Sequence, residues 1–319
     1  MSKFKEKERK NAISKIKSSN PVFYGGIGGV LFMGKKRDFI LINEGKNFYY
    51  KIYPQVLDYF TKNKIAWWGG NKPTGNVLSS QIACLNHLFD LRKDKKAVLS
   101  LLESVSNDFI DVIEIKTDAV GTRGYIQFEA VSDFDHLNER IVTRGSNCTS
   151  IDALIYAKHK DGSRWLILIE WKYTESYGNL NLAIDGCIVK PQKCKGKVRR
   201  ERYTQLICAS KQLKNKDNYC FYFEPFYQLM RQTLWAEQII IHKSCERLKA
   251  ENFLHIHVIP KGNIDLISKK YSCSGDVLET TWKNHLIDPA KYIILSPDMF
   301  LSKVKGYNDL IKYLENRYW

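Results

Sequence analysis

The sequence lacks a Cys-x-x-Cys pair, because its eight cysteines are scattered at positions 84, 148, 187, 194, 208, 220, 245 and 273. We therefore expect reduced thiols; a zinc site that joins Cys187 and Cys194 to histidines is the less favoured alternative. No apolar stretch approaches the about 20 residues of a membrane span. Residues 1–20 also lack the uninterrupted hydrophobic region of a signal peptide. These absences predict a cytoplasmic protein with no membrane segment.

Acidic residues are scarce relative to basic ones. Asp and Glu number 34 against 50 Lys and Arg, which gives a formal net charge of +16 and a pI near 9.3. Much of the excess lies in two runs, since residues 1–20 hold seven basic and two acidic residues and residues 190–202 hold seven and one. A solvated charged face is the ordinary explanation of such runs, but an excess of this size favours a polyanionic partner.

The glycine cluster at residues 25–29 lacks the Lys-Ser/Thr that follows a phosphate-binding loop, so we expect a flexible turn there. Chain-breaking residues at 67–74 indicate a domain boundary. With 319 residues and 44% hydrophobic composition, the chain can bury a large core as one large or two smaller domains. We interpret residues 1–76 as a basic N-terminal extension, beginning with a charged helical or frayed arm, and residues 77–319 as the main domain.

Charged residues appear abruptly at the ends of two neighbouring predicted strands. Asp152 opens a strand over residues 152–156, and Glu170-Trp171-Lys172 follows the apolar run 165–169. Side chains alternate along a strand, so Glu170 and Lys172 share one face. Because the run is apolar on both faces, we expect a central strand whose terminal charges line a cleft. A solvated strand-end pair is the alternative.

The segment 160–163 between these strands has the composition of a hairpin turn. A loop of residues 161–162 would put Asp152 opposite Trp171, on the wrong face. A loop of residues 161–163 instead pairs Asp152 with Lys172, and Gly162 tolerates the left-handed conformation that such a loop needs. The longer loop makes a joint site of Asp152, Glu170 and Lys172 feasible.

The segments 150–155 and 168–175 resemble the motifs of the PD-(D/E)XK nuclease superfamily, the fold of many restriction endonucleases. The segments 78–86 and 222–232 are similar to a bacterial restriction-endonuclease-like branch of it, and Ile151 stands where the motif has proline. The resemblance implies an α/β fold, a restriction-endonuclease-like mixed β-sheet core flanked by α-helices. Residues 77–319 would then be a nuclease domain with C-terminal additions.

The same resemblance implies that Asp152 and Glu170 bind Mg²⁺, helped by the main-chain carbonyl of Trp171; Mn²⁺ can substitute. Lys172 would orient or deprotonate the attacking water and stabilise charge at phosphorus. An extra upstream acid often assists metal binding in this superfamily. The candidates for that position are Glu129, at the end of a predicted strand over residues 125–130, and its rivals Gln81 and Asn86.

Other elements follow from periodicity and turn signals. We expect helices near 79–91, 95–105 and 203–213 and strands over 219–223 and 253–259. A helix that begins near Pro225 has a predicted core face of Phe226, Met230, Leu234 and Ile241 and a second face of Gln228, Arg231, Gln232 and Trp235. The resemblance puts this helix beside the active site, so Gln228 and Arg231 are candidates for water positioning and phosphate binding. His255 and His257 are interpreted as ordinary strand histidines.

Together these features predict a Mg²⁺-dependent DNA endonuclease, most simply a type II restriction enzyme that cuts double-stranded DNA as a homodimer. The predicted DNA contacts are Lys193, Lys195, Lys197, Arg199, Arg200 and Arg231. A structure-specific or repair nuclease is the enzymatic alternative. A non-cleaving DNA-binding module on the same fold is the alternative of a different class.

Overall fold

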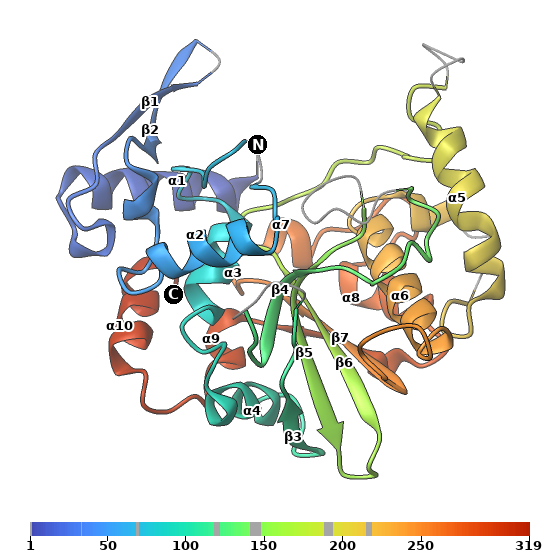
Figure 1. The fold of residues 1–319 in the computed structure, drawn as a ribbon. Coiled ribbons are helices and arrows are strands. Elements are labelled where there is room, and N and C mark those ends of the chain that lie inside the picture. The colour runs from blue at the N-terminus through green and yellow to red at the C-terminus, as the bar shows by residue number, and fades with distance from the viewer. Residues whose placement is uncertain are drawn as a thin grey trace.

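A computed structural model describes residues 2–32, 34–67, 70–117, 122–140, 148–187, 194–214 and 219–319. Its centre is a mixed six-stranded sheet in the order β3-β5-β6-β7-β8, with β4 also paired to β5 (Figure 1). Antiparallel pairs join β3, β4 and β6 to β5, and parallel pairs join β6 to β7 and β7 to β8. The strands are β3 Phe109–Ile113, β4 Ile126–Ala130, β5 Ile151–His159, β6 Arg164–Trp171, β7 Asn252–Val258 and β8 Tyr292–Leu295.

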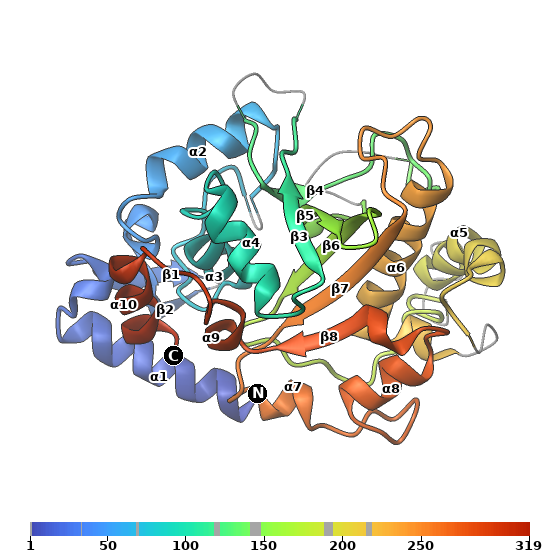
Figure 2. The same ribbon diagram turned by 90° about the horizontal axis from the view of Figure 1, so that it is seen from below.

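Helices cover both faces of this sheet (Figure 2). One face packs against α1 Lys3–Lys17, α2 Tyr53–Lys62, α3 Ser80–Leu88, α4 Lys95–Glu103, α9 Pro297–Phe300 and α10 Asn308–Arg317. The other packs against α5 Lys195–Ala209, α6 Phe226–Ile241, α7 Ile264–Ile267 and α8 Leu278–Asn284. The predicted fold class, a mixed sheet flanked by helices, is confirmed.

Alternation along β6 builds both cores. Ile167 and Ile169 join the first core, while Leu166 and Leu168 join the second, and all four are fully buried. This is the central strand that the continuous apolar run predicts, because only a strand covered on both faces has no polar side.

Helices α3 and α4 each begin directly after a residue whose side chain caps the helix N-terminus. Ser79 caps α3 by accepting a hydrogen bond from the Ile82 amide, and Asp94 caps α4 by accepting from the amides of Lys96 and Ala97. Both helices were predicted within a few residues of these bounds.

Three expectations were wrong. Residues 219–222 form the 3-10 helix η4 Tyr219–Tyr222 rather than a strand, and this segment turns directly into α6; the next residue, Phe223, makes an isolated antiparallel bridge to Asn181. The helix expected over residues 203–213 begins earlier, because the described part of the basic run from Lys195 onwards forms the first half of α5, in keeping with the good helix propensity of Lys and Arg. Ile241 is 58% exposed at the end of α6 and does not extend that helix's core face.

The N-terminal residues form α1, the two-stranded sheet of β1 Gly28–Phe32 and β2 Lys35–Leu41, and α2, with the 3-10 helices η1 Pro21–Phe23 and η2 Glu44–Asn47 between them. Another 3-10 helix, η5 Pro289–Lys291, precedes β8. The first core includes buried residues of this region, such as Phe23, Phe48 and Phe60, together with residues of the central sheet. A division at residue 76 stays a prediction. Within the described parts of the chain, no helix is both long and apolar enough to cross a membrane.

The C-terminus is held against α3 through His87. Its Nδ1 lies 2.7 Å from the Ala83 carbonyl oxygen, and its Nε2 accepts from the Trp319 indole N–H at 3.2 Å. The ring packs on Trp171 and Tyr318 and is 1% exposed. This arrangement fits a neutral imidazole, and burial lowers the pKa of His87 to about 3.

We expect His87 to make the protein acid-sensitive. Its folded-state pKa lies below the unfolded value, so the unfolded chain binds more protons between about pH 6.5 and pH 3. The stability that His87 contributes is therefore lost as the pH falls through this window. Urea unfolding at pH 7, 6 and 5 should show that the wild type loses more stability than His87→Gln, by about 0.7 kcal/mol from pH 7 to 6 and about 1.2 kcal/mol from pH 6 to 5. Equal pH slopes in the two proteins would contradict this account.

Candidate functional site

A cleft of about 1980 Å³ opens at one end of the central sheet. Its lining includes Glu129, Asp152, Glu170 and Lys172 from β4, β5 and the end of β6. The described residues that line it comprise eleven Lys and Arg and seven Asp and Glu. The basic residues are Lys5, Arg9, Arg37, Lys72, Arg140, Lys172, Lys195, Lys197, Arg199, Arg202 and Arg231, and the acidic ones are Glu44, Glu129, Glu139, Asp152, Glu170, Glu175 and Glu201.

Strand register brings the carboxylates together. The pairing of Ala153 with Ile169 on β5 and β6 sets Asp152 opposite Glu170. The predicted shared face is correct, but the predicted pairing of Asp152 with Lys172 is wrong by two residues along β6. The turn uses residues 160–162, because the His159 amide bonds the Ser163 carbonyl, and Gly162 adopts φ +89° as expected. The two-residue shift leaves every side chain on its predicted face.

Glu129 on β4 adds a third carboxylate beside Asp152 and Glu170, and we call these three side chains the carboxylate row. Phe128 pairs with Ala153 and Ala130 with Ile151, so Glu129 lies opposite Asp152. Glu129 has φ +48°, a left-handed conformation that costs energy for a residue with a side chain and is most common at functional sites. Three carboxylates thus stand side by side on three adjacent strands.

The structure distinguishes the three candidates for the additional residue that assists metal binding, which are Glu129, Gln81 and Asn86. Gln81 lies in the cleft and donates to Glu129 at 2.7 Å, and Ser150 donates to the other carboxylate oxygen at 3.0 Å. Asn86 lies elsewhere, where it accepts from the Tyr49 amide and donates to the Tyr318 hydroxyl. Glu129 and Gln81 therefore belong to the site geometry, and Asn86 holds the N- and C-terminal regions together.

Burial and mutual repulsion shift the pKa values of the carboxyl groups in this row. Burial, and then the nearby charges of Glu170 and Glu129, raises the pKa of Asp152 well above its ordinary value. Burial also raises the pKa of Glu129, to which Glu170 adds. Glu170 behaves differently: its burial acts to raise the pKa, but the Lys172 ammonium group more than offsets it and lowers that pKa.

Lys172 is the cation that compensates the row. Its Nζ lies 2.5 Å from Glu170 Oε1, and both side chains are less than a tenth exposed. Burial acts to lower the pKa of Lys172, but Glu170 raises it well above its usual value. Asp152 Oδ2 accepts from the Trp171 amide at 2.8 Å, which fixes the backbone between the two charged residues.

Helix α6 places the side-chain amides of two glutamines next to Lys172 and the carboxylate row. Gln228 Oε1 accepts from Lys172 Nζ at 2.7 Å and from the Tyr177 hydroxyl at 3.3 Å. Gln232, one turn later, donates to Glu170. Gln228 was predicted to reach the site, whereas Gln232 and Tyr177 were not given roles. The spacing of Gln228 and Gln232 by four residues on one helix face is the signal that could have paired them.

Arg231 faces the site but is engaged within the protein. It bonds Thr149 Oγ1 at 3.0 Å and Glu139 Oε1 at 3.2 Å, and Glu139 also accepts from the Tyr203 hydroxyl at 2.6 Å. Glu139 was not predicted from the sequence, since its partners Thr149, Tyr203 and Arg231 come from three other segments of the chain. Trp235, on the predicted second face of α6, is 2% exposed and therefore a core residue.

The donor set suits a hard cation without forming a closed cage. In the parts of the chain that the structure covers, no group of three or more His, Cys, Asp or Glu side chains is arranged to hold a metal ion. Glu129 and Glu170 are turned towards protein donors. However, Mg²⁺ is commonly bound by one or two carboxylates together with water and substrate phosphates rather than by an all-protein cage. Two adjacent carboxylates that repel each other, as Asp152 and Glu170 do, fit that mode.

His255 and His257 lie on β7, the strand next to β6, and are close to the site. His257 is paired with Glu170 across the β6–β7 ladder, and it approaches the Tyr292 hydroxyl at 2.8 Å. Burial lowers the pKa of His255 to about 4, and neither of its ring nitrogens has a hydrogen-bond partner among the residues that the structure describes. Both are neutral strand histidines, as predicted.

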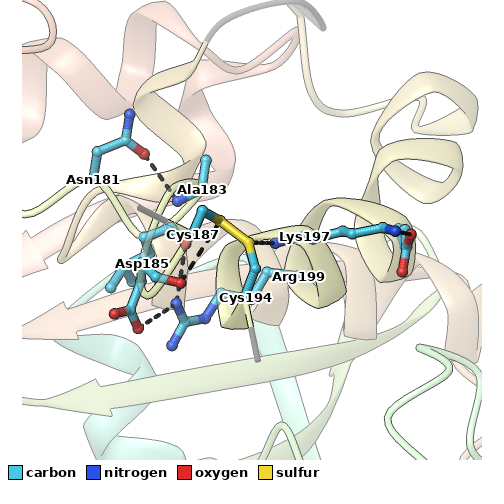
Figure 3. Close-up of a disulfide and its surroundings, with 9 residues drawn as sticks. Asn181, Ala183, Asp185, Cys187, Cys194, Lys197 and Arg199 are labelled. Atoms are coloured by element: carbon cyan, nitrogen blue, oxygen red, sulfur yellow. Dashed lines mark hydrogen bonds and ion pairs between the residues drawn. A yellow bond between two sulfur atoms is a disulfide. The ribbon is translucent and has the colours of Figure 1, made fainter. Parts of the chain in front are cut away.

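Cys187 and Cys194 form a disulfide with a Cα–Cα distance of 4.2 Å (Figure 3). The expectation of reduced thiols is wrong for this pair, because residues 185–187 lie against the first turn of α5. Gly196 donates to the Asp185 carbonyl, and Arg199 donates to the Asp185 carboxylate at 2.9 Å. Within the described chain, the cysteines at positions 84, 148, 208, 220, 245 and 273 form no disulfide.

The predicted DNA-contacting residues of α5 separate into different environments. Lys195 and Lys197 are exposed and line the cleft, whereas Arg199 is held by Asp185. Arg200 lies on the same helix but is not among the cleft-lining residues. Lys193 lies outside the described residues.

A family model described as "restriction endonuclease associating with ARP" matches residues 6–319, nearly the whole chain. The chain belongs to this family. A restriction-endonuclease-like family is therefore confirmed, while membership of the PD-(D/E)XK superfamily stays a prediction. Neither the curated proteins nor the solved structures give a match.

Arg231 should matter more for stability than for DNA contact. Arg231→Gln removes the charged partner of a carboxylate that is 4% exposed, so we expect the free energy of unfolding to fall by about 2 kcal/mol. Lys195→Gln, on the exposed side of the cleft, should change it by less than about 0.5 kcal/mol. Urea unfolding compares the two, and equal stabilities would show that the Arg231–Glu139 pair is not structural.

Proposed function

We propose that this protein is a Mg²⁺-dependent DNA endonuclease that hydrolyses phosphodiester bonds at the row formed by Glu129, Asp152 and Glu170. Membership of a restriction-endonuclease family supports DNA as the substrate. One observation carries the proposal: adjacent carboxylates on β4, β5 and β6, with an ammonium group 2.5 Å from Glu170, lie in a cleft whose walls are rich in basic residues.

The chain's own residues would share the work as follows. Lys172, fixed by Glu170 and Gln228, presents a cation that can hold the attacking water and stabilise negative charge as it develops on the phosphate. Gln232 fixes Glu170, and Gln81 and Ser150 fix Glu129, so the acidic side chains are oriented before substrate arrives. Preorganised groups of this kind lower the barrier because they need no rearrangement during the reaction.

Asp152 and Glu170, with the main-chain carbonyl of Trp171, are the residues that would hold Mg²⁺, and Mn²⁺ would take the same oxygen ligands. The ion would supply Lewis-acid stabilisation of the phosphate and a more acidic water at neutral pH. Lys195 and Lys197 would hold the DNA backbone by neutralising phosphates.

Within this activity, we favour a type II restriction enzyme that works as a homodimer. Each chain supplies one carboxylate row, and cutting both strands of a symmetric sequence requires two such rows related by a two-fold axis. A structure-specific or repair nuclease would need the same chemistry with a different DNA.

The first test replaces single carboxylates. Asp152→Asn keeps an acceptor for the Trp171 amide, so the local fold should persist while cleavage of supercoiled plasmid falls at least ~10²-fold. Because Asn removes a charge from a row of like charges, we also expect the free energy of unfolding to rise by about 1 kcal/mol. Excess EDTA should stop the wild-type reaction, and added Mg²⁺ should restore it.

Asp276→Asn is the matched control, since it makes the same substitution at an exposed position that does not line the cleft. It should cut at close to the wild-type rate. Wild-type cleavage by Asp152→Asn, or wild-type cleavage in EDTA, would remove the assignment. Retained DNA binding without cleavage by the wild type under any divalent cation would indicate a non-cleaving DNA-binding module.

The second test concerns Lys172. Lys172→Met keeps the bulk of the side chain but removes its charge, so cleavage should fall at least ~10²-fold while DNA is still bound. Lys172→Arg should restore little activity, because a planar guanidinium is larger than an ammonium group and places its charge differently. The rates are measured on plasmid under saturating Mg²⁺.

Loss of Lys172 also leaves Glu170 buried without its cation, so Lys172→Met alone could lose activity by unfolding. The double variant Glu170→Gln with Lys172→Met removes both charges and should recover stability without recovering cleavage. Near wild-type cleavage by Lys172→Met would exclude the assigned role of this residue.

A further inference from the structure

The β1–β2 hairpin forms part of the cleft wall that faces α5. In Figure 1 the hairpin and α5 project from the same side of the molecule at opposite ends. Val30 and Arg37 on the hairpin line the same cleft as Lys195 and Lys197 on α5 and as the carboxylate row. The hairpin is thus the counterpart of the basic helix across the site.

The two faces of this hairpin differ. Val30 pairs with Arg37, and these two line the cleft, whereas the next pair, Leu31 with Lys36, does not. Since side chains alternate along a strand, Leu31 and Lys36 point to the opposite face. Leu31 is 73% exposed there, so that face is open to solvent at Leu31, while nearer the base of the hairpin Asp38 pairs with Lys17 of α1.

The base of the hairpin is held firmly, which leaves the ribbon as a supported arm. The Leu41 side chain is buried, and its amide donates to the Gly75 carbonyl at 2.9 Å. A bulge separates Gly28 from Val30, and Gly29 adopts φ +117°. Bulges at such positions increase the twist of a two-stranded ribbon and redirect its side chains.

Cations on this wall are available to a ligand. Among the residues that the structure describes, neither Arg37 nor Lys5 makes a side-chain ion pair, although both line the cleft. On the other wall, Arg199 and Arg231 are engaged by Asp185 and Glu139. A polyanion in the cleft would therefore meet uncompensated positive charge at the hairpin.

We propose that the β1–β2 ribbon is a sequence-reading arm: double-stranded DNA lies between α5 and the ribbon, and the Val30–Arg37 face enters the major groove. This inference rests on the proposed DNA substrate. The major groove, about 12 Å wide, admits a two-stranded ribbon. There an arginine can bond the O6 and N7 acceptors of guanine, and an apolar side chain can contact a thymine methyl group.

The test compares two cations on one strand. Full-length wild type, Arg37→Gln and Lys36→Gln are each incubated in EDTA with 30-base-pair duplexes whose central positions are randomised, and the bound duplexes are sequenced. Arg37→Gln should lose preference at one or two positions and weaken binding to the preferred duplex at least about tenfold. Lys36→Gln removes the same charge from the opposite face and should keep the wild-type preferences.

Two results would refute the proposal that the β1–β2 ribbon reads DNA sequence. One is an Arg37→Gln variant that behaves as Lys36→Gln does. The other is equal weakening on every duplex with a smaller salt dependence, which is the signature of a phosphate contact without sequence reading. Because the binding assay runs without cleavage, either result leaves the catalytic proposal standing if wild type still cuts plasmid with Mg²⁺. Conversely, an arm that selects sequences in a protein that never cuts would refute only the catalytic proposal.

Discussion

The structure depends on compensation of buried negative charge at the ends of β4, β5 and β6. Three carboxylates on adjacent strands repel one another, and isolated charges in such surroundings are costly. Lys172, Gln232, Gln81 and Ser150 each satisfy part of this row. These partners come from the strand end itself, from α6, from α3 and from the segment before β5. The positions of the two helices over the sheet are therefore tied to the row.

The same row explains how the surrounding cleft is charged. Basic residues predominate on its walls, and the acids concentrate where the strands end. A cleft with this distribution attracts a phosphate backbone from solution and presents a negative, cation-seeking site at the point where the backbone would be held. The left-handed backbone at Glu129 adds a local cost that the packed sheet tolerates.

The walls come from segments at different distances along the chain. One wall is built by residues that precede the sheet, and it is fastened by the C-terminal residues through His87, Asn86 and Arg317. The opposite wall is the stretch between β6 and β7, where a disulfide and the Asp185–Arg199 pair fix the start of α5. The central strands thus carry the charged row, while additions on each side shape the space above it.

The sequence by itself determined the central strands, the starts of α3 and α4, and the shared face of Asp152, Glu170 and Lys172. Alternation and capping are local rules, and a shift of two residues in register does not change which face a side chain occupies. The register itself, the β1–β2 ribbon and the disulfide were decided by tertiary structure. Tertiary structure also decided the partners of Glu139, and it decided that Gln81 lies in the cleft while Asn86 does not. Each of these features depends on contacts between segments far apart in the chain, for which no local pattern exists.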